Sequence, residues 1–283
     1  MPELPEVETI KRSLEKSLLG KRIVGVQILL AKQFKGEKKQ VLGKRVTAIK
    51  RRGKILIISL SGGKNLVIHF KLTGQLVWVP GKGRRVTLGH PIPFAGSELP
   101  AKTTHIIFDI DGGQLFFNDL RQFGWVKVID ENDLEKETDK LGVEPLTENF
   151  SHEYLKQAFS KTKKPIKLVL MDQEKIAGIG NIYANEALFE AGILPTRPAK
   201  ELTEIQLKKL KDAVFKVLKE GLKYGGSSAA DEAYIKPTGE AGEYQKHFRV
   251  YQRENQQCNK CGGKIKRINL GGRGTFFCPT CQR

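Results

Sequence analysis

The chain begins with Met1-Pro2-Glu3-Leu4-Pro5-Glu6-Val7-Glu8-Thr9. A proline in the first turn and acidic side chains near the start both favour a helix that begins here. Apolar residues then recur at helical spacing, at Val7, Ile10, Leu14 and Leu18. Gly20 follows the last of them, as a C-cap would. We therefore expect a leading helix of about four turns with one buried face.

The same stretch has a reactive end. Met1 precedes a small residue, so we expect its removal, which leaves Pro2 as the amino terminus. An α-amino group has a pKa of about 7.7–8.0, against about 10.4 for lysine, so a sizeable fraction is unprotonated at neutral pH. A secondary amine also forms a charged iminium with a carbonyl, which serves Schiff-base chemistry. Prolines and acids alone, however, are more often only a helix start.

Composition points to a polyanionic partner. The 283 residues carry a formal net charge of +18, with a pI near 9.7, and such a length suits more than one domain. Charge alone does not separate DNA from RNA or anionic lipid. No apolar run has membrane-span length and no secretory signal is recognisable, so we expect no membrane association and a cytoplasmic protein.

Residues 1–130 read as a β domain after the leading helix. Short, often β-branched segments alternate with glycine-rich turns, which predicts an antiparallel β-sandwich with the helix packed on it. The range 80–102 is expected to be a long loop. The predicted strands are Ile23–Leu30, Arg45–Arg51, Ile55–Leu60, Leu66–His69, Gln75–Val79, Thr104–Ile110, Gln114–Asn118 and Trp125–Ile129.

The second half is predicted to be helical. Residues 131–150 are locally acidic and are interpreted as an interdomain linker. Apolar spacing in 151–253 then predicts helices near 154–159, 166–172, 185–191 and 203–224. The fold class expected for the whole chain is therefore α+β and multidomain, with this helical domain followed by a small terminal element at 254–283.

Four cysteines predict a structural metal site in that element. Cys258 and Cys261 form one pair and Cys278 and Cys281 another, with 16 residues between the pairs. This spacing is typical of a four-cysteine zinc site, and the alternative of two disulfides conflicts with a reducing cytoplasm. With all four positions taken by cysteine, one Zn²⁺ per chain would be structural.

Several motifs, in order along the chain, resemble those of the formamidopyrimidine-DNA glycosylases (the Fpg/MutM family). The resemblance implies a bacterial-type DNA-repair enzyme that excises oxidised purines, such as 8-oxoguanine and formamidopyrimidines, and then cleaves the strand. It implies a helix–two-turn–helix motif in the helical domain and a β-hairpin zinc finger at the end. The matching motifs lie at residues 2–9, 51–54, 69–74, 118–124, 176–186 and 258–281.

The resemblance assigns the chemistry to the first residues. Pro2 would be the nucleophile and Glu3 the general acid, while Glu6 would hold the terminus in place. Lys54, in Arg51-Arg52-Gly53-Lys54, would reach the phosphate and sugar beside the lesion, although a lysine after glycine is more often merely solvated.

Two further motifs imply contacts that replace an extruded base. His69 and Leu72 belong to His69-Phe70-Lys71-Leu72-Thr73-Gly74, where Leu72 stands in place of the family's methionine wedge. Leucine is a known type of intercalating side chain. In the motif at 118–124, Arg121 would bond to the orphaned cytosine and Phe123 would insert into the stack, although such a phenylalanine is more often in a core.

The remaining motifs imply contacts with the DNA backbone. Gly178, Gly180 and Asn181 would clamp phosphates, and Arg273 of the finger would grip those that flank the damaged nucleoside. The range 224–254 resembles the lesion-recognition segment, with departures at 227–231 and at Gln252, where glycine is usual.

The expected partner is double-stranded DNA with oxidised bases or abasic sites, bound by a monomer associated with the nucleoid. Two other readings stay open. One is an enzyme similar to endonuclease VIII, which acts on oxidised pyrimidines, although Leu4-Pro5 and the motif at 118–124 argue against it. The other is a non-enzymatic zinc-ribbon nucleic-acid-binding protein, which would have no need of Pro2 and Glu3.

Overall fold

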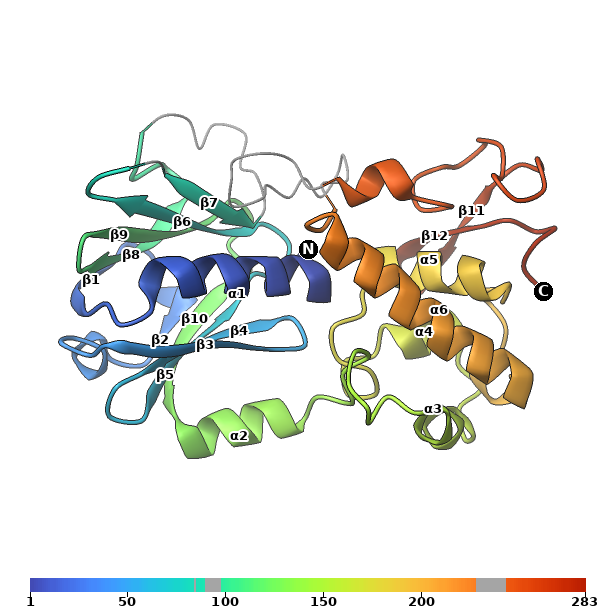
Figure 1. Ribbon diagram of the computed structural model, residues 1–283, viewed down its shortest axis with the longest axis horizontal. Coiled ribbons are helices and arrows are strands. Elements are labelled where there is room, and N and C mark those ends of the chain that lie inside the picture. The colour runs from blue at the N-terminus through green and yellow to red at the C-terminus, as the bar shows by residue number, and fades with distance from the viewer. Residues whose placement is uncertain (84, 90–97, 228–242) are drawn as a thin grey trace. The chain divides into compact units, whose positions relative to one another are not determined.

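A computed structural model describes residues 1–83, 85–89, 98–227 and 243–283 (Figure 1). Its internal contacts divide the chain into two compact units. The first unit comprises Met1–Asp139 and Tyr224–Gln245, and the second comprises Lys140–Lys223 and Lys246–Arg283. Among the described residues, 131–139, 224–227 and 243–245 thus belong to the first unit. The sequence predicts a linker at 131–150 and a helical domain at 151–253.

The first unit is the expected β-sandwich with a leading helix, α1 (Leu4–Leu18). Each sheet has five strands, all antiparallel to their neighbours except for one parallel pair, β2 and β10. In spatial order, one sheet is β1 (Ile23–Ile28), β8 (Thr104–Ile110), β9 (Gly113–Asp119), β6 (Gly74–Pro80) and β7 (Val86–Gly89). The other is β2 (Phe34–Lys35), β10 (Trp125–Asp130), β5 (Lys64–His69), β4 (Ile55–Leu60) and β3 (Val46–Arg52).

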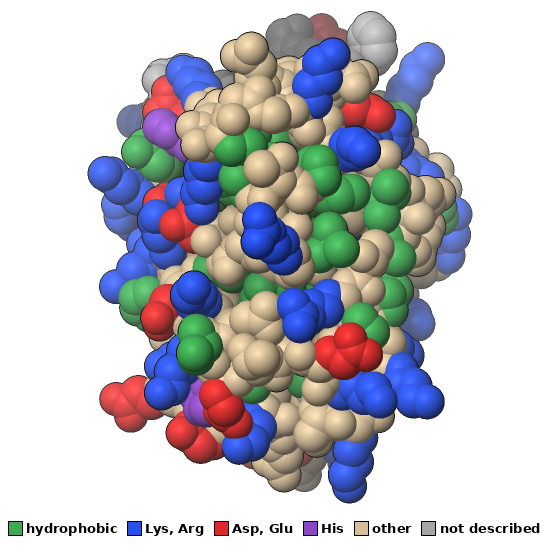
Figure 2. Space-filling model, turned by 90° about the vertical axis from the view of Figure 1, so that its right-hand side faces the viewer, with side chains coloured by type: hydrophobic (Ala, Val, Ile, Leu, Met, Phe, Trp, Pro, Cys, Tyr) green, Lys and Arg blue, Asp and Glu red, His purple; other side chains and the backbone are tan. Residues whose placement is uncertain are grey.

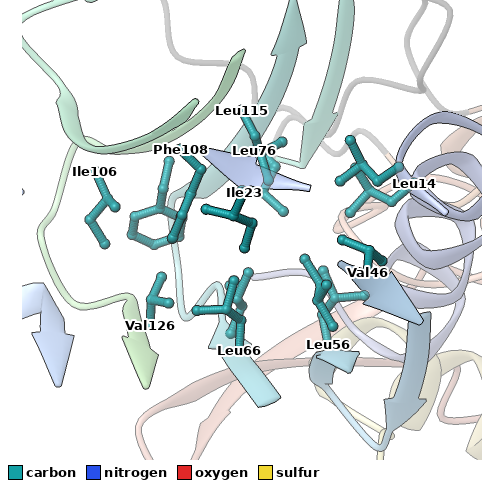
Figure 3. Close-up of a cluster of buried hydrophobic side chains, with 14 of the residues drawn as sticks. Leu14, Ile23, Val46, Leu56, Leu66, Leu76, Ile106, Phe108, Leu115 and Val126 are labelled. Atoms are coloured by element: carbon teal, nitrogen blue, oxygen red, sulfur yellow. The ribbon is translucent and has the colours of Figure 1, made fainter. Parts of the chain in front are cut away.

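One hydrophobic core lies between the two sheets and α1 (Figure 3). Leu14 of α1, Phe108 of β8 and Leu56 of β4 are all fully buried in it. The helix contributes because its apolar residues recur on one face, and the strands contribute because alternate side chains point inward. This core fixes the start of α1, and with it Pro2 and Glu3.

Two strands and one α-helix among the described residues of the first unit were not predicted. Val86–Gly89, inside the range expected to be a loop, forms β7 and pairs with β6. Phe34–Lys35 forms the two-residue strand β2, which is too short to show alternation. Glu131–Asp139, inside the predicted linker, forms helix α2, which buries Leu134 and is tied to β5 by a hydrogen bond from Asn65 to Glu131.

The second unit has four α-helices among its described residues, close to the predicted positions. The third begins four residues earlier than expected. Their bounds are α3 (His152–Phe159), α4 (Ile166–Leu170), α5 (Asn181–Ala191) and α6 (Glu204–Lys223). A hairpin of β11 (Lys266–Leu270) and β12 (Arg273–Phe277) follows, which confirms the predicted fold class. Short 3₁₀ turns span Ala31–Gln33, Lys38–Gln40, Ala199–Glu201 and Tyr244–His247.

In the part of the chain that the structure describes, no helix is both long and apolar enough to cross a membrane. The positive charge is not gathered in one place on the face drawn in Figure 2, where Lys and Arg side chains are interleaved with acidic ones.

Candidate functional site

The amino terminus is held by Glu6. The Glu3 and Glu6 side chains are buried, and Pro2 is buried beside them. One Glu6 carboxylate oxygen, Oε2, accepts a hydrogen bond of 2.9 Å from the backbone N–H of Glu3. This bond fixes the backbone next to Pro2 and supports a holding role for Glu6.

The other oxygen of the same carboxylate reaches a distant segment of the first unit. Glu6 Oε1 accepts a hydrogen bond of 2.9 Å from the backbone N–H of Ser227. Gly226 has φ +85°, and a Cβ there would lie 2.9 Å from Glu6 Cγ, so only glycine allows this approach. Further along the chain, the N–H of Tyr244 donates a hydrogen bond of 3.1 Å to the carbonyl of the same Gly226. The expected lesion-recognition residues at 228–231 and 239–242 lie outside the described residues.

Lys54 is buried, unlike an ordinary solvated lysine. It follows Gly53, whose φ of +55° forms the turn between β3 and β4. Arg51 braces that turn, because its Nη1 donates to the Gly53 carbonyl at 3.0 Å and its Nε donates to Glu8 of α1 at 3.0 Å. Burial raises the pKa of Glu8, but hydrogen bonds from Arg51 and Arg12 outweigh it and hold that pKa below its usual range.

His69 is neutral and has a fixed tautomer. Burial, with Lys71 and Lys54 nearby, lowers the pKa of His69 to about 3. Its Nδ1 accepts a hydrogen bond of 2.9 Å from the backbone N–H of Lys71, so the ring proton is on Nε2. His69 can therefore donate from Nε2 to a phosphate without carrying a charge.

The residues predicted to fill the space of an extruded base lie on two loops. Leu72 is half-buried on a turn closed by a hydrogen bond of 2.9 Å from the N–H of Gly74 to the carbonyl of Phe70. Phe123 is 54% exposed, although a phenylalanine in a β domain is more often in the core. The guanidinium carbon of Arg121 lies 5.2 Å from the centre of the Phe123 ring. An exposed aromatic ring with a cation over it is suited to stacking on a base.

In the second unit, the predicted phosphate-clamp residues lead into α5. Gly178 has φ +99°, and its N–H donates to Gln173 Oε1 at 2.9 Å. Gly178 therefore shapes the turn, and its N–H is already engaged within the chain. Gly180 is the N-cap of α5 and Asn181 is its first residue, which places Asn181 at the positive end of the helix dipole.

Two buried polar side chains hold the finger against this motif, and neither was singled out from the sequence. Asn185 donates to the Asn181 carbonyl at 2.6 Å and accepts from the N–H of Phe276 in β12 at 2.8 Å. Lys167 of α4 donates to the Gly274 carbonyl at 2.9 Å and to Thr275 Oγ1 at 2.7 Å. The only hint of Lys167 in the sequence is a cation within the apolar run Ile166–Leu170.

Glu186 organises the segment that enters the zinc element. Its buried carboxylate accepts hydrogen bonds from the backbone N–H groups of Arg249, Val250 and Tyr251 at 2.9–3.0 Å. Burial raises the pKa of Glu186 despite these bonds. The guanidinium of Arg249 also donates to Glu220 of α6 at 2.7 Å. The sequence had matched residues 250–253 to the family without showing what they bind.

The four cysteines form a compact cluster suited to zinc. Their sulfur atoms lie within 4.8 Å of one another. The Cys258 and Cys281 sulfurs are 3.8 Å apart, and those of Cys261 and Cys278 are 3.5 Å apart. Zinc bound to four thiolates at about 2.3 Å requires sulfur separations of about 3.8 Å, so the set fits the ion. All four ligands come from the chain, which leaves no open position for catalysis.

The protonation of these thiols depends on the backbone around them. A hydrogen bond from the Gly263 N–H, with the neighbouring thiols, lowers the pKa of Cys261 to about 7. Burial, with the neighbouring thiols, raises the pKa of Cys281 to about 12 and also raises that of Cys278. Without metal, the thiols of Cys278 and Cys281 therefore keep their protons at neutral pH, and binding zinc would release them.

Comparison with known proteins covers the whole chain. Three family profiles match in succession: the formamidopyrimidine-DNA glycosylase N-terminal domain at residues 1–126, its H2TH domain at 141–233, and the zinc finger found in FPG and IleRS at 255–283. Their order is the order of the elements described above.

Individual relatives agree. A formamidopyrimidine-DNA glycosylase from Pelotomaculum thermopropionicum is 42% identical, over 100% of this chain and 99% of its own. Structures of the Lactococcus lactis Fpg were solved with DNA that contains Fapy-dG or an abasic site; each is 31% identical, with TM-scores of 0.86 and 0.87. Each matches 99% of this chain. The match covers 100% of the chain in the Fapy-dG complex and 99% of the chain in the abasic-site complex. A third, with DNA containing an oxidized pyrimidine, is 32% identical over the full length of both chains, with a TM-score of 0.86.

Proposed function

Because the chain belongs to the formamidopyrimidine-DNA glycosylase family, we propose that it excises oxidised purines from duplex DNA through a Schiff base on Pro2 and then cleaves the strand. The activity is that of a DNA-formamidopyrimidine glycosylase and an abasic-site lyase. The observation that carries the mechanism is the buried terminus, where Glu6 holds the backbone of Glu3 beside Pro2. A protein that only binds nucleic acid would have no need of Pro2 and Glu3 at this position.

The first chemical step forms a bond from the Pro2 nitrogen to C1′ of the damaged nucleoside while the bond to the base breaks. Glu3 donates a proton to the sugar ring oxygen as the ring opens, which is general acid catalysis. The product is an iminium that carries a positive charge next to C2′. That charge acidifies C2′, so the 3′ phosphate and then the 5′ phosphate leave by successive β- and δ-elimination.

The damaged base must leave the stack before C1′ can be reached, at a cost of a few kcal/mol. Leu72 enters the space left by the base and Phe123 stacks beside it. Arg121 offers its guanidinium to the orphaned base. The exposure of Phe123 and its contact with Arg121 support these assignments.

Other residues hold the DNA backbone. Lys54 and His69 do so from the first unit, with His69 as a neutral donor, and Asn181 and Arg273 do so from the second. Gly178 and Gly180 shape the turn into α5. Phosphate contacts of this kind position the duplex and carry no sequence information. Zinc on Cys258, Cys261, Cys278 and Cys281 is structural and supports the finger that presents Arg273.

The partner follows from the same family membership. Its relative from Lactococcus lactis is bound to DNA with damaged or abasic sites, and we assign the same substrate to this chain. We further propose that the chain acts as a monomer in the bacterial cytoplasm, where the genomic DNA lies.

A second candidate substrate is an oxidised pyrimidine, because the Lactococcus lactis relative has been solved with DNA of that kind. Borohydride trapping separates the candidates, with matched duplexes that contain 8-oxoguanine, an oxidised pyrimidine or no damage. We expect fastest trapping on 8-oxoguanine and none on intact DNA. Faster trapping on the pyrimidine would reverse the preference, and absence of a covalent product on every duplex would refute the glycosylase–lyase mechanism.

A further inference from the structure

Asp119, at the end of β9, is a fully buried carboxylate at the meeting point of two loops of the first unit. Its Oδ1 accepts a hydrogen bond from the hydroxyl of Thr73. Its Oδ2 accepts from the N–H of Gly124 at 2.7 Å and from Nε2 of Gln33 at 2.9 Å. Both oxygens are thus bonded to groups from separate parts of the chain.

The hydroxyl of Thr73 makes a second bond that connects the same two loops. Its oxygen accepts a hydrogen bond of 2.9 Å from the backbone N–H of Arg121. Thr73 directly follows Leu72, and Arg121 lies two residues before Phe123. The pair Thr73–Asp119 therefore joins the turn of Leu72 to the loop of Arg121 and Phe123.

The far end of the second loop is fixed equally closely. A Cβ on Gly124 would lie 2.9 Å from Phe117 Cζ and 3.0 Å from Asp119 Oδ2, so the backbone lies directly against both. Gln33 Nε2 also donates to the Gly124 carbonyl at 3.0 Å. Hydrogen bonds to a buried carboxylate are stronger than those between neutral groups, and losing one leaves a buried group unpaired.

We propose that Asp119 and Thr73 are positioning residues that make the Leu72 turn and the Arg121–Phe123 loop enter DNA as one piece. This rests on the proposed function, which supplies the roles of Leu72, Arg121 and Phe123. With the network intact, neither loop inserts without the other. With it broken, each loop inserts independently and the combined insertion becomes slower.

The structure offers a matched pair of variants. Thr73→Val removes the bridging hydroxyl at nearly constant volume. Thr104→Val removes a second buried hydroxyl, which donates to Asn118 Oδ1 at 2.7 Å and accepts from the N–H of Ala101 at 2.9 Å. The Thr104 hydroxyl bonds to Asn118 and the Thr73 hydroxyl bonds to the next residue of β9, Asp119. Of the two threonines, Thr73 is the one that joins the Leu72 turn to the Arg121–Phe123 loop.

The coupling of the loops can be measured with 2-aminopurine beside an 8-oxoguanine, because its fluorescence reports unstacking as the wedge enters. Leu72→Ala and Phe123→Ala are measured singly and together. When Thr73 is unchanged, we expect the double variant Leu72→Ala/Phe123→Ala to insert only slightly more slowly than the slower of the two single variants. In the Thr73→Val background we expect their effects to multiply.

We also expect Thr73→Val alone to slow insertion about tenfold, the scale of one lost buried hydrogen bond, with Thr104→Val unchanged. Thr73→Ser keeps the hydroxyl and should restore both the rate and the coupling. Unchanged coupling in Thr73→Val, or an equal effect of Thr104→Val, would overturn the proposal.

Two measurements keep this result separate from misfolding and from the proposed function. Thr73→Val and Thr104→Val should unfold at similar temperatures, and recovery by Thr73→Ser excludes a folding defect at that position. Trapping of the unaltered chain on 8-oxoguanine tests the enzyme mechanism. If trapping occurs while the loops remain coupled in Thr73→Val, the network proposal alone is wrong.

Discussion

The carboxylate of Glu6 joins two parts of the first unit that lie 221 residues apart, because its Oε1 accepts the backbone N–H of Ser227 at 2.9 Å. Its other oxygen accepts the N–H of Glu3. One side chain thus holds both the amino terminus, where we propose the nucleophile lies, and Ser227, the last described residue before 228–242 in the segment that resembles the lesion-recognition loop.

Replacing Glu6 should therefore impair catalysis more than an ordinary helix substitution. In Glu6→Gln, the side-chain NH₂ group would face either the N–H of Glu3 or the N–H of Ser227, and two donors cannot bond to each other. We expect borohydride trapping to slow by about 10- to 100-fold, which corresponds to roughly 1.4–2.7 kcal/mol. Glu15→Gln is the control, because Glu15 lies on the same helix, where it forms a partly exposed ion pair with Lys11 and has no contact with the terminus among the described residues. Equal rates for the two variants would contradict the holding role.

Phe123 should matter for excision and not for stability. It is 54% exposed, and the nearby Leu120 is 53% exposed, so both can be truncated without opening a core cavity. We expect Phe123→Ala to slow 8-oxoguanine excision about tenfold, the value of one base-stacking contact, with Leu120→Ala close to the unaltered chain. Single-turnover excision and thermal unfolding measure the two quantities. A lower unfolding temperature for Phe123→Ala alone would instead indicate a core role.

His69 should make the fold sensitive to acid. Its pKa of about 3 in the folded chain lies below the value of about 6.5 in the unfolded chain. The unfolded chain alone therefore binds a proton between those values, and stability falls as the pH falls from about 7 toward 3. At pH 5 the loss should be about 2 kcal/mol.

His69→Asn tests this, because asparagine keeps an acceptor for the Lys71 N–H and does not titrate. The difference in unfolding free energy between pH 7 and pH 5 should shrink by that amount in the variant. If the unfolding free energy of the two chains depended on pH in the same way, His69 would take up its proton as readily in the folded chain as in the unfolded chain, and its pKa would not be lowered.

Arg273 should contribute one phosphate contact. The slope of log affinity against log salt is negative, and Arg273→Gln should reduce its magnitude by about 0.9. Arg267→Gln is the control on the adjacent strand, because Arg267 lies 3.7 Å from Glu254 and is partly neutralised by it. If Arg267→Gln changes the slope as much as Arg273→Gln does, the finger acts only through its total charge.

Zinc should be present at about one ion per chain and should not take part in the chemistry. Cys261→Ser should lose the metal and duplex binding together, because the finger that carries Arg273 depends on it. Since the pKa values of Cys278 and Cys281 are raised, zinc affinity should increase with pH around neutrality. Metal analysis of freshly reduced protein measures the stoichiometry, and a clearly substoichiometric value would count against the site.

Local patterns were enough to predict most of the fold. The leading helix and eight of the strands follow from apolar spacing and turn residues, because these are properties of neighbouring residues. β7 was missed because it is a four-residue strand within a stretch rich in glycine, proline and basic residues, although its partner β6 directly precedes it in the chain. α2 was missed because the strand that it bonds to, β5, is distant in sequence. An acidic stretch was taken as a linker although Leu134 gives it a buried side.

The candidate site divides in the same way. Residues within a recognisable motif, such as Pro2 and Arg273, could be named from the sequence. The pairs of residues that hold such motifs in place could not be predicted, because their members are far apart in the sequence. Thr73 and Asp119 are 46 residues apart, and Lys167 and Thr275 are 108 residues apart. Only the folded chain brings such pairs into contact.

Pro2, freed from Met1, is the proposed nucleophile on which the mechanism depends. The most direct measurement is to trap the chain with borohydride on an 8-oxoguanine duplex, digest the adduct and locate the added mass by peptide mass spectrometry. We predict that the sugar remnant is on the nitrogen of Pro2, in a peptide that lacks Met1. An adduct on Lys54 or any other lysine, or on a chain that retains Met1, would show that Pro2 is not the nucleophile.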